Sequence, residues 1–275
     1  MAGPFTGVPV REALASARVA LEGAGVDSPR LDAELLLAHA LGIDRTRLFL
    51  RADTPVEGPA IRAFQTAVRR RAVERVPVAY LVGWKGFRRL DLHVDDRVLI
   101  PRPDTEALVE WAVAMLPRGA RVLDVGTGSG AIALALKDER PDLEVLATDV
   151  DAGALAIAAA NAWRLGLDVG FHAGDLLAGL SADAILSNPP YVEAGAALAP
   201  EIGHEPAGAL FAGPDGLDVY RRLVPAIAAS GARLAGLEIG ATQATAVRAL
   251  WPSDWTTDVG TDLAGRDRVV TAWRS

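Results

Sequence analysis

The first part of the chain has apolar residues at the spacing of helices. Over residues 10–75 they recur every three or four positions, as on one face of a helix, so helices are expected throughout. The clearest of them is predicted at 28–41. Ser28 followed by Pro29 is a typical helix start, and Gly42 stands where a glycine commonly ends a helix.

A further helix is predicted at 59–75, and its last part is rich in arginine. The arginines are Arg69, Arg70, Arg71 and Arg75. They form either a basic face for a nucleic acid or an acidic partner, or an ordinary solvated helix face, and charge runs of this kind are more commonly the second.

The pattern changes after residue 77 to aromatic and branched residues. Residues 78–100 contain Gly83 and Gly86 and alternate apolar with polar positions at 90–94, which predicts a short hairpin between two domains. A helix is expected at 105–116. Strand and helix patterns then alternate, which is typical of an α/β fold with a mostly parallel sheet covered on both faces. The expected strands are 121–125, 144–148, 169–173, 184–187, 233–239 and 268–273.

Composition narrows the class of protein. A length of 275 residues suits two domains, and a hydrophobic share of 51% suits packed cores. The absence of cysteine excludes disulfides, thiol nucleophiles and cysteine-based metal sites, and no metal is expected. Because the sequence has neither a signal-like start nor a long apolar run, a cytoplasmic protein without a membrane partner is expected. The net charge of -7 disfavours extended nucleic-acid binding.

A glycine-rich loop follows the expected strand at 121–125 and leads into a helix expected at 131–137. Glycines let the backbone turn sharply and approach a ligand, and open parallel sheets bind ligands at the carboxyl ends of their strands. The Gly-x-Gly-x-Gly spacing lacks the later glycine of the dinucleotide fingerprint and favours a compact ligand that carries an amino acid. The candidate cofactor-binding residues are Asp124, which also suits a capping role, Gly126, Thr127, Gly128, Ser129 and Gly130.

Two further acidic residues end expected strands. Asp149 lies about twenty residues beyond the loop, where a carboxylate can accept hydrogen bonds from both ribose hydroxyls. Asp175, followed by Leu176, is a candidate contact for an adenine amino group, and a turn or a helix cap explains it nearly as well. Together with the loop, these residues indicate a nucleoside cofactor.

The tetrapeptide Asn188-Pro189-Pro190-Tyr191 follows the expected strand at 184–187, so it lies at the same edge of the sheet. Two consecutive prolines make the backbone rigid, which leaves the Pro189 carbonyl and the Asn188 side-chain oxygen as fixed acceptors for a planar NH2 group. These acceptors can direct the nitrogen lone pair to the methyl of a sulfonium, and Tyr191 can stack on the planar group. The four residues are the predicted catalytic and substrate-binding residues of an S-adenosylmethionine-dependent methyltransferase, and Asn188 is also expected beside the cofactor.

These motifs closely resemble those of the release-factor glutamine methyltransferases, the PrmC/HemK family. The resemblance covers nearly the whole chain. Besides the glycine loop and the tetrapeptide, it includes residues 77–83 (Pro-Val-Ala-Tyr-Leu-Val-Gly), 99–106 (Leu-Ile-Pro-Arg-Pro-Asp-Thr-Glu), 204–206 (His-Glu-Pro), 213–217 (Gly-Pro-Asp-Gly-Leu) and 262–268 (Asp-Leu-Ala-Gly-Arg-Asp-Arg).

The resemblance implies a reaction and a domain organisation. S-adenosyl-L-methionine would methylate the side-chain amide nitrogen of the glutamine in the Gly-Gly-Gln motif of class 1 peptide-chain release factors, with S-adenosyl-L-homocysteine as product. A helical-bundle domain at 1–76 would bind the release factor, and a β-hairpin linker at 77–103 would follow it. Residues 104–275 would form a class I, Rossmann-like methyltransferase domain with a mostly parallel seven-stranded sheet.

The resemblance also assigns residue roles and shows two departures. It implies that Arg102 and Pro103 help shape the pocket for the glutamine amide. Gly86 stands where family members often have an acidic residue, which affects a linker contact. Leu176 stands where they often have an aromatic residue, so it would offer only apolar packing to the adenine.

Three other functions compete with this interpretation. An adenine-N6 or cytosine-N4 nucleic-acid methyltransferase would present the same conjugated NH2 to the tetrapeptide, but it must reach a flipped or unpaired base. A noncatalytic release-factor adaptor would keep the cofactor site for stability alone. A nicotinamide oxidoreductase fits less well, because the glycine spacing differs.

Overall fold

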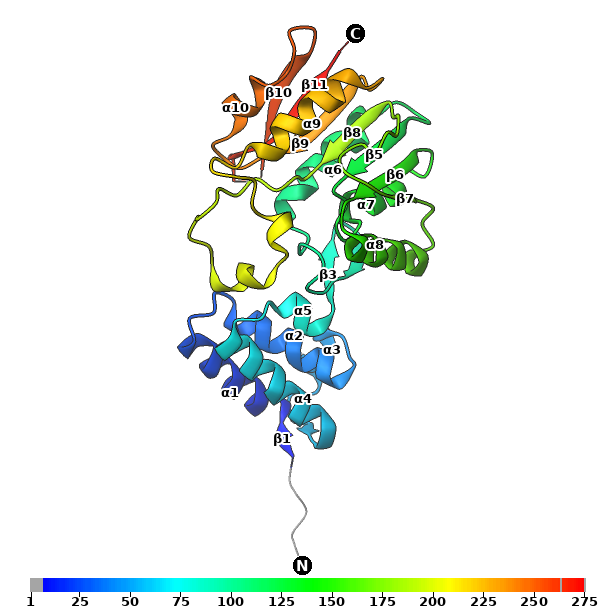
Figure 1. Cartoon of the computed structure of the whole chain (residues 1–275). Coiled ribbons are helices and arrows are strands. Elements are labelled where there is room, and N and C mark those ends of the chain that lie inside the picture. Colours follow the sequence, from blue (N-terminus) through cyan, green and yellow to red (C-terminus); the bar gives the residue numbers. More distant parts are fainter. Residues whose placement is uncertain (1–6, 263, 275) are drawn as a thin grey trace, which may run out of the picture. The chain divides into compact units, whose positions relative to one another are not determined.

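The structure of the chain is a computed structural model that describes residues 7–262 and 264–274, and these fold as two units (Figure 1). The first unit comprises the chain up to Gly83 together with Ala199–His204, and the second comprises Trp84–Leu198 and the chain from Glu205 onward. Residues 1–6, Leu263 and Ser275, which belong to segments named above, lie outside the described residues. No helix of the described part is long and apolar enough to cross a bilayer.

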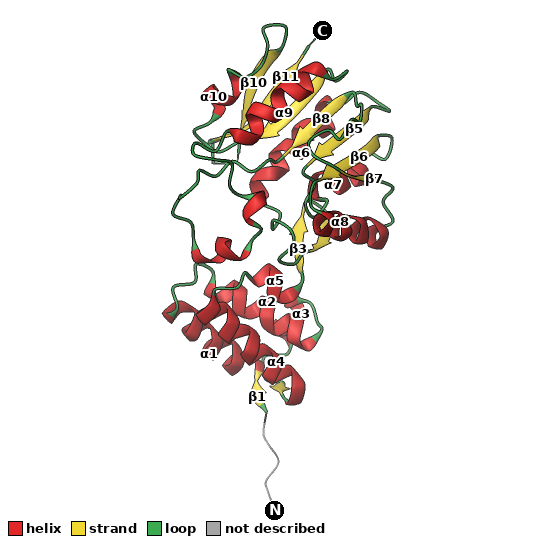
Figure 2. Cartoon of the chain, in the orientation of Figure 1, coloured by secondary structure: helices red, strands yellow, loops and turns green. Residues whose placement is uncertain are grey.

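The first unit is a helical bundle, as predicted from the apolar spacing (Figure 2). Its core is formed by one face each of its longer helices, with Leu21, Leu37 and Phe64 almost fully buried. Two strands of two residues each, at residues 8–9 and 55–56, also pair antiparallel in this unit. The elements are β1 (Val8–Pro9), α1 (Val10–Gly23), α2 (Pro29–Leu41), α3 (Arg45–Leu50), β2 (Pro55–Val56), α4 (Gly58–Arg69), the π-helical turn η1 (Arg70–Glu74), α5 (Val78–Val82) and the 3₁₀ turn η3 (Pro200–His204).

Helix α2 confirms the predicted helix at 28–41, with one difference at its start. Gly42 has a left-handed φ of 62° and donates its N–H back to the helix, as expected of a C-terminal glycine. The Ser28 hydroxyl, however, does not cap the helix backbone and instead donates to the Asp32 carboxylate at 2.7 Å. Because Asp32 is buried, it needs such donors, and it takes the hydroxyl from the capping position.

The arginine-rich stretch does not form a basic face. Arg71 is only 6% exposed and donates to Asp32 and to Glu201, each at 2.7 Å, and Arg75 approaches the same Glu201 carboxylate at 2.6 Å. Burial raises the pKa of Glu201, but the Arg71 hydrogen bond and the two positive charges outweigh burial and hold the pKa below its usual range. Both interpretations of the stretch are therefore wrong for Arg71 and Arg75, because the buried Asp32 and the half-buried Glu201 hold these side chains in ion pairs.

We expect Arg71→Ala to lower the free energy of unfolding of the first unit by about 3–5 kcal/mol, because it leaves the buried Asp32 carboxylate without its counter-charge and removes one of the two arginines paired with Glu201. Urea unfolding followed by circular dichroism measures the change. Arg70→Ala is the matched control, since Arg70 forms a half-exposed pair with Glu74, and such pairs contribute about 0–1 kcal/mol. Equal losses in the two variants would contradict the structural role of Arg71.

The second unit is built on a seven-stranded sheet in the order β10-β11-β9-β8-β5-β6-β7. Strands β7, β6, β5, β8 and β9 run parallel, and β11 is antiparallel to both β9 and β10. The predicted fold class is confirmed. The strands are β5 (Arg121–Val125), β6 (Glu144–Asp149), β7 (Gly170–Ala173), β8 (Ala184–Ser187), β9 (Leu234–Glu238), β10 (Thr256–Thr261) and β11 (Asp267–Trp273).

Helices cover both faces of this sheet because alternate strand residues point to opposite faces (Figure 1). Val122 and Leu186 belong to the core beneath α6 and α7, whereas Leu123 and Ile185 belong to the core beneath α9. The helical elements are η2 (Pro103–Thr105), α6 (Glu106–Met115), α7 (Ala131–Glu139), α8 (Ala152–Leu165), the 3₁₀ turn η4 (Ala207–Ala209), α9 (Asp218–Ala229) and α10 (Ala244–Arg248).

Two parts of the chain differ from the sequence expectation. The hairpin is confirmed as β3 (Trp84–Phe87) and β4 (Leu90–His93), but residues 78–82 form helix α5, which Gly83 ends with a left-handed φ of 81°. Strand β10 was not expected, because its polar residues at the sheet edge show no apolar pattern. Its antiparallel pairing with β11 places it in the sheet.

Candidate active site

The glycine loop and the tetrapeptide begin side by side at one edge of the sheet. Val125, the last residue of β5, pairs with Ser187, the last residue of β8, and on its other side with Thr148 of β6. The Ser187 hydroxyl donates to the Val125 carbonyl at 2.7 Å, which locks the two strand ends together. Gly126 and Asn188, which follow these ends, therefore leave the sheet next to each other.

The glycine loop has a backbone that only glycine adopts easily. Gly126, Gly128 and Gly130 have φ values of 71°, 56° and 86°. A Cβ atom at Gly126 or Gly128 would meet nothing within 4 Å, so both glycines border open space, whereas one at Gly130 would lie 2.8 Å from Leu134. The Thr127 N–H, like that of Gly126, donates to the end of β6. The loop thus forms a fixed cradle with room for a ligand.

Asp124 supports this loop from beneath. Its Oδ2 accepts hydrogen bonds from the Thr127 hydroxyl at 2.7 Å and from the Ala133 N–H at 3.2 Å, so the capping role suggested by the sequence is present. Its Oδ1 is buried without a partner among the described residues. Burial, offset in part by these hydrogen bonds, raises the pKa of Asp124 to about 7. A ligand with a positively charged N–H donor would satisfy the free oxygen.

Asp149 stands at the end of β6 and faces the glycine loop. Its Oδ2 accepts from the Gly128 N–H and its Oδ1 from the Asp151 N–H, both at 2.9 Å. These bonds hold the carboxylate at the loop while each oxygen keeps a free lone pair. Ser129, also in the loop, is buried, and its carbonyl accepts from Asn161 at 3.0 Å.

The third acidic candidate is already paired in the structure. Asp175 forms a hydrogen-bonded ion pair with Arg222, and both side chains are more than half exposed. Leu176, the next residue, is half-buried with a φ of 50°, and its carbonyl accepts from the Thr148 hydroxyl at 2.8 Å. This bond ties Leu176 to the end of β6. The Asp175 carboxylate is paired with Arg222, which the sequence did not indicate as a partner.

The tetrapeptide is held on both sides by hydrogen bonds. The Asn188 Nδ2 donates to the Thr105 hydroxyl oxygen at 3.1 Å, so the Asn188 carbonyl oxygen is not used by this bond. The Tyr191 backbone carbonyl accepts a hydrogen bond from the Gln243 Nε2 at 3.1 Å. The Gln243 side chain is itself held by the Gly240 N–H, which donates to its Oε1 at 3.0 Å. The two ends of the tetrapeptide are therefore positioned by elements far away in the sequence.

Close packing behind Tyr191 requires a glycine at position 216. Gly216 has a φ of 71°, and a Cβ atom there would lie 2.3 Å from the Tyr191 carbonyl oxygen. The Gln243 side chain also reaches the Gly216 carbonyl at 3.3 Å. Gly216 belongs to the segment 213–217, so this contact gives that segment a physical role.

Tyr191 remains a neutral phenol under ordinary conditions. Burial, together with the nearby Glu238 carboxyl, raises the pKa of Tyr191 to about 12. A phenol of this kind can pack against a planar group or donate a hydrogen bond, but it does not act as a base near pH 7.

The predicted pocket residue Arg102 is fixed by a buried carboxylate. It donates to Glu205, whose second oxygen accepts from the Ile100 N–H at 3.0 Å. Pro103 is exposed and begins η2, the turn that carries Thr105. Arg102 and Glu205 thus connect two of the segments that the sequence singled out separately.

Sequence reasoning missed several residues that hold the site. Thr105 and Glu205 lay within segments already noted, but they were given no role. Glu238 left a usable signal, because it is a single acidic residue in an otherwise apolar strand. Gln243 left none, since only the fold brings it to the tetrapeptide.

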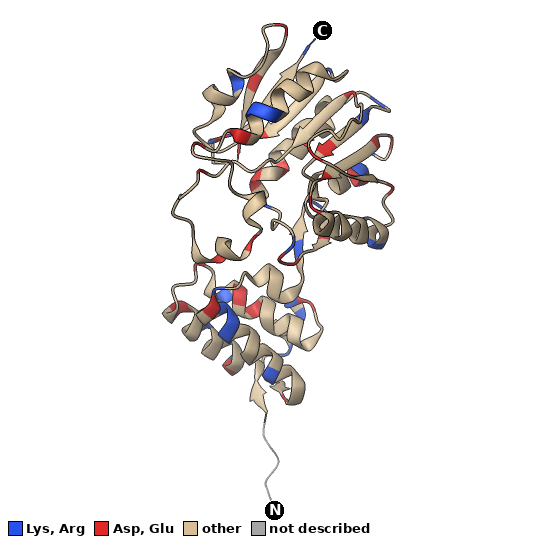
Figure 3. Cartoon of the chain, in the orientation of Figure 1, with Lys and Arg blue, Asp and Glu red and all other residues tan. Residues whose placement is uncertain are grey.

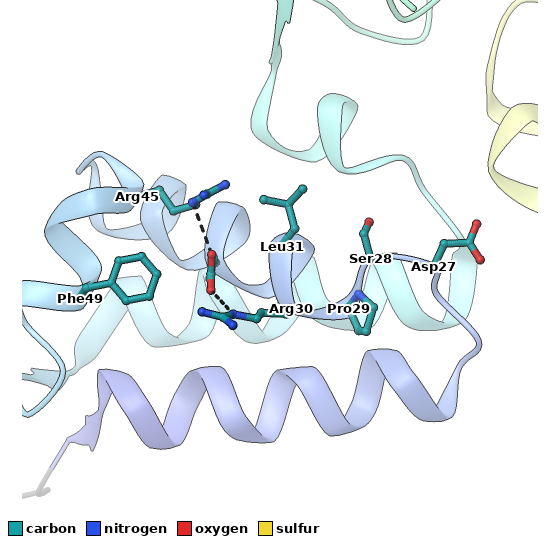
Figure 4. A pocket seen from close by; sticks show the side chains of 8 residues that line it. Asp27, Ser28, Pro29, Arg30, Leu31, Arg45 and Phe49 are labelled. Carbon is teal, nitrogen blue, oxygen red and sulfur yellow. Dashed lines mark hydrogen bonds and ion pairs between the residues drawn. The ribbon is translucent and has the colours of Figure 1, made fainter. Parts of the chain in front are cut away.

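A separate cavity of about 440 Å³ lies in the first unit (Figure 4). Among its lining residues, the Glu34 carboxylate lies 2.9 Å from Arg30 and 3.4 Å from Arg45. Leu31 and Phe49, which also line it, are 41% and 52% exposed. None of the sequence-predicted site residues lines this cavity.

Charged residues of both signs are interspersed along both units (Figure 3). The stretch that looked most basic from the sequence is neutralised by ion pairs, as described above for Arg71 and Arg75.

The sheet order, with the glycine loop after β5 and an acidic residue after β6, defines a class I methyltransferase, whose methyl donor is S-adenosyl-L-methionine. The residues present fit this cofactor, because the loop borders open space and the Asp124 Oδ1 has no donor in the described part of the chain. A model of the PrmC N-terminal domain matches residues 12–83, and one of the methyltransferase small domain matches residues 104–212.

Two curated relatives match almost from end to end. The release factor glutamine methyltransferase of Mycolicibacterium smegmatis is 45% identical, and the alignment covers 96% of this chain and 98% of that protein. That of Deinococcus radiodurans is also 45% identical, over 97% and 99% of the two chains. The chain belongs to the release factor glutamine methyltransferase family.

Solved structures share the fold at low sequence identity. A methyltransferase from Pyrococcus furiosus has a TM-score of 0.52 and 16% identity, covering 68% of this chain and 89% of that one. The Thermus thermophilus 16S rRNA N2 G1207 methyltransferase, in complex with AdoMet and guanosine, has a TM-score of 0.51 and 20% identity, covering 70% and 50%. These likenesses support the class I fold of the second unit.

Asp149→Ala is expected to raise the Kd for S-adenosylmethionine by about 10- to 100-fold, because it would remove the hydrogen bonds predicted to the ribose hydroxyls and removes one support of the loop. Isothermal titration calorimetry measures this. The control is Asp151→Ala, which removes the N-cap of α8 but no cofactor contact, and should leave the Kd within about two-fold. An unchanged affinity in Asp149→Ala would remove this residue from the ribose site.

Proposed function

We propose that this protein transfers a methyl group from S-adenosyl-L-methionine to the side-chain amide nitrogen of the glutamine in the Gly-Gly-Gln motif of class 1 release factors. The observation that carries the proposal is its 45% identity, over nearly the full length, to release factor glutamine methyltransferases. The products are the N5-methylated glutamine and S-adenosyl-L-homocysteine. We assign the reaction to the cytoplasm, consistent with a chain that has no cysteine.

In the proposed mechanism the tetrapeptide holds the glutamine NH2. An amide nitrogen is a weak nucleophile because its lone pair is delocalised into its carbonyl group. The Asn188 Oδ1 and the Pro189 carbonyl accept one N–H each, which aligns the lone pair with the methyl. Bound S-adenosylmethionine supplies an electrophilic methyl on a positively charged sulfur. The nitrogen gains the methyl and releases one proton, and the Tyr191 ring closes the pocket over the planar amide.

The cofactor-binding role is proposed for the neighbouring loop. Gly126, Thr127, Gly128, Ser129 and Gly130 form the cradle for the amino-acid end. Their left-handed glycines and open border support this assignment.

The carboxylates beside this loop complete the proposed cofactor site. Asp124 accepts from the cofactor ammonium, and Asp149 accepts from the ribose hydroxyls. Leu176 packs on the adenine. Asp175 adds a contact at the adenine edge that its pair with Arg222 weakens, because the two partners compete for the same carboxylate.

The helical domain is proposed as the main contact for the release factor. In the proposed organisation it spans residues 1–76, a hairpin linker follows at 77–103, and the methyltransferase domain spans 104–275. Exposed apolar side chains beside a cavity are typical of protein interfaces, and Leu31 and Phe49 occupy such a place in the first unit.

Mass spectrometry of a class 1 release factor tests the proposed reaction. After incubation with the protein and S-adenosylmethionine, we expect one added methyl, located on the glutamine of the Gly-Gly-Gln loop. Isotope-labelled cofactor with nucleic acid in place of the release factor is the parallel reaction. Label that enters nucleic acid and not the release factor would overturn the proposal in favour of a base methyltransferase.

Asn188→Ala is the matched variant for that experiment. It should lower kcat by at least about 100-fold, because it removes one of the two acceptors that orient the amide. The Kd for S-adenosylmethionine should stay within about two-fold, which separates the proposed enzyme from a noncatalytic adaptor. Undiminished turnover would refute the role of Asn188.

Combined Leu31→Ala and Phe49→Ala substitutions are expected to raise the KM for the release factor by at least about five-fold, because they shorten two side chains at the proposed contact. The kcat at saturating release factor should not change. Val19→Ala is the control, since Val19 is an exposed apolar residue of α1 that does not line the cavity. An equal KM in all three proteins would place the contact elsewhere.

A further inference from the structure

Glu238 is a buried carboxyl group without a structural reason of its own. It ends β9 with 0% exposure, and neither of its oxygens has a hydrogen-bond partner at normal distance among the described residues. The Tyr220 hydroxyl donates to its backbone carbonyl at 2.6 Å, so the end of the strand is held in place. An isolated buried carboxyl group destabilises a fold, and a residue of this kind at a functional site calls for an explanation.

Thr105 contacts Asn188 of the tetrapeptide and is also a neighbour of Glu238. Its hydroxyl oxygen accepts from the Asn188 Nδ2 at 3.1 Å. The same hydroxyl lies close enough to the Glu238 carboxyl to lower the pKa of that group. A hydroxyl has one hydrogen to donate, and Thr105 uses a lone pair to accept from Asn188, so its hydrogen stays available to the neighbouring Glu238 carboxyl group.

We propose that Thr105 and Glu238 are positioning residues that set the orientation of the Asn188 side-chain amide. The inference rests on the proposed function and names two residues that act through Asn188 rather than on the substrate itself. Their effect is to turn the Asn188 oxygen, not its NH2 group, toward the glutamine.

The direction of the hydrogen bonds follows from the charge on Glu238. An ionised carboxylate can only accept, so Thr105 donates to it and offers its lone pairs to the Asn188 NH2 group. Asn188 Oδ1 is then free to accept from the substrate. A neutral Glu238 can donate its own proton to Thr105, which lets the Thr105 hydrogen turn to the Asn188 oxygen. Asn188 then presents an NH2 group to the substrate NH2, and the two donors repel.

The surroundings of Glu238 let both states be reached. Burial raises its pKa to about 7, against the effects of the neighbouring Thr105 hydroxyl and of the positive charges of Arg268 and Arg102, while Asp104 raises it further. The phenols of Tyr191 and Tyr220 also face Glu238, and their own pKa values are raised, so both stay neutral. The active, ionised state is therefore lost as the pH falls through about 7.

Thr105→Val tests the role of the Thr105 hydroxyl, because valine replaces it with a methyl group of similar size and shape. At pH 8 we expect kcat on the release factor to fall about 10- to 100-fold, because Asn188 loses the partner that fixes its amide. The Kd for S-adenosylmethionine and the KM for the release factor should stay within about two-fold. Thr105→Ser restores the hydroxyl and should recover most of kcat, which a loss of packing alone would not explain. Undiminished kcat in Thr105→Val, or no recovery in Thr105→Ser, would overturn the proposal.

The pH profile of kcat tests Glu238. For the wild type at saturating cofactor and release factor, kcat should be about ten-fold lower at pH 6 than on its alkaline plateau, since one protonation removes the active state. Glu238→Gln cannot titrate, so its kcat should be flat over the same range. Saturating cofactor removes the contribution of Asp124, whose pKa is also about 7 but which contacts the cofactor loop.

The outcomes separate this inference from the proposed function. A flat wild-type profile, or the same step in Glu238→Gln, overturns the positioning role while the enzyme still methylates the release factor. A wild-type protein that methylates no release factor at pH 8 overturns the function, and the inference with it.

Discussion

The parallel pairing of β5 with β6 on one side and β8 on the other is the constraint on which the rest of the structure depends. Parallel strands end at the same edge of a sheet, so three loops that are remote in sequence emerge together. The Ser187 hydroxyl bound to the Val125 carbonyl holds this edge at the point where the glycine loop and the tetrapeptide begin. A shift of one residue in this pairing would turn alternate side chains to the opposite face and separate the proposed cofactor from the proposed acceptor.

Two buried carboxyl groups at this edge of the sheet lower the stability of the fold near neutral pH. Asp124 and Glu238 are both fully buried, and burial raises the pKa of each to about 7. In both groups the folded pKa lies above the ordinary value, so the folded protein binds more protons than the unfolded chain between about pH 4 and pH 7. Its stability therefore decreases as the pH rises through that window. This loss of stability occurs at the two positions where we propose that a carboxylate accepts a hydrogen bond from the cofactor or from Thr105.

The helical region and most strands could be predicted because their apolar spacing is local. Residues 121–125 and 184–187 were placed to the residue. Strand β10 could not, since its polar residues are held by pairing with β11 rather than by burial. The glycine loop and tetrapeptide were visible as motifs, whereas Gln243 and Glu238 became neighbours of the tetrapeptide only through the order of strands. Arg71 was misread because its partner Glu201 lies 130 residues further along the chain.

The segment Ala199–His204 has a consequence for how the chain is connected. It leaves the second unit after Leu198 and returns at Glu205, and in between it supplies Glu201 to Arg71 and Arg75 of the first unit. The helical unit is thus discontinuous in sequence. Cleavage of the peptide bond after Gly83 would leave the helical fragment attached to the rest of the chain only by noncovalent contacts, among them the ion pairs of Arg71 and Arg75 with Glu201. A fragment ending at Gly83 would retain Arg71 and lose one of its two counter-charges.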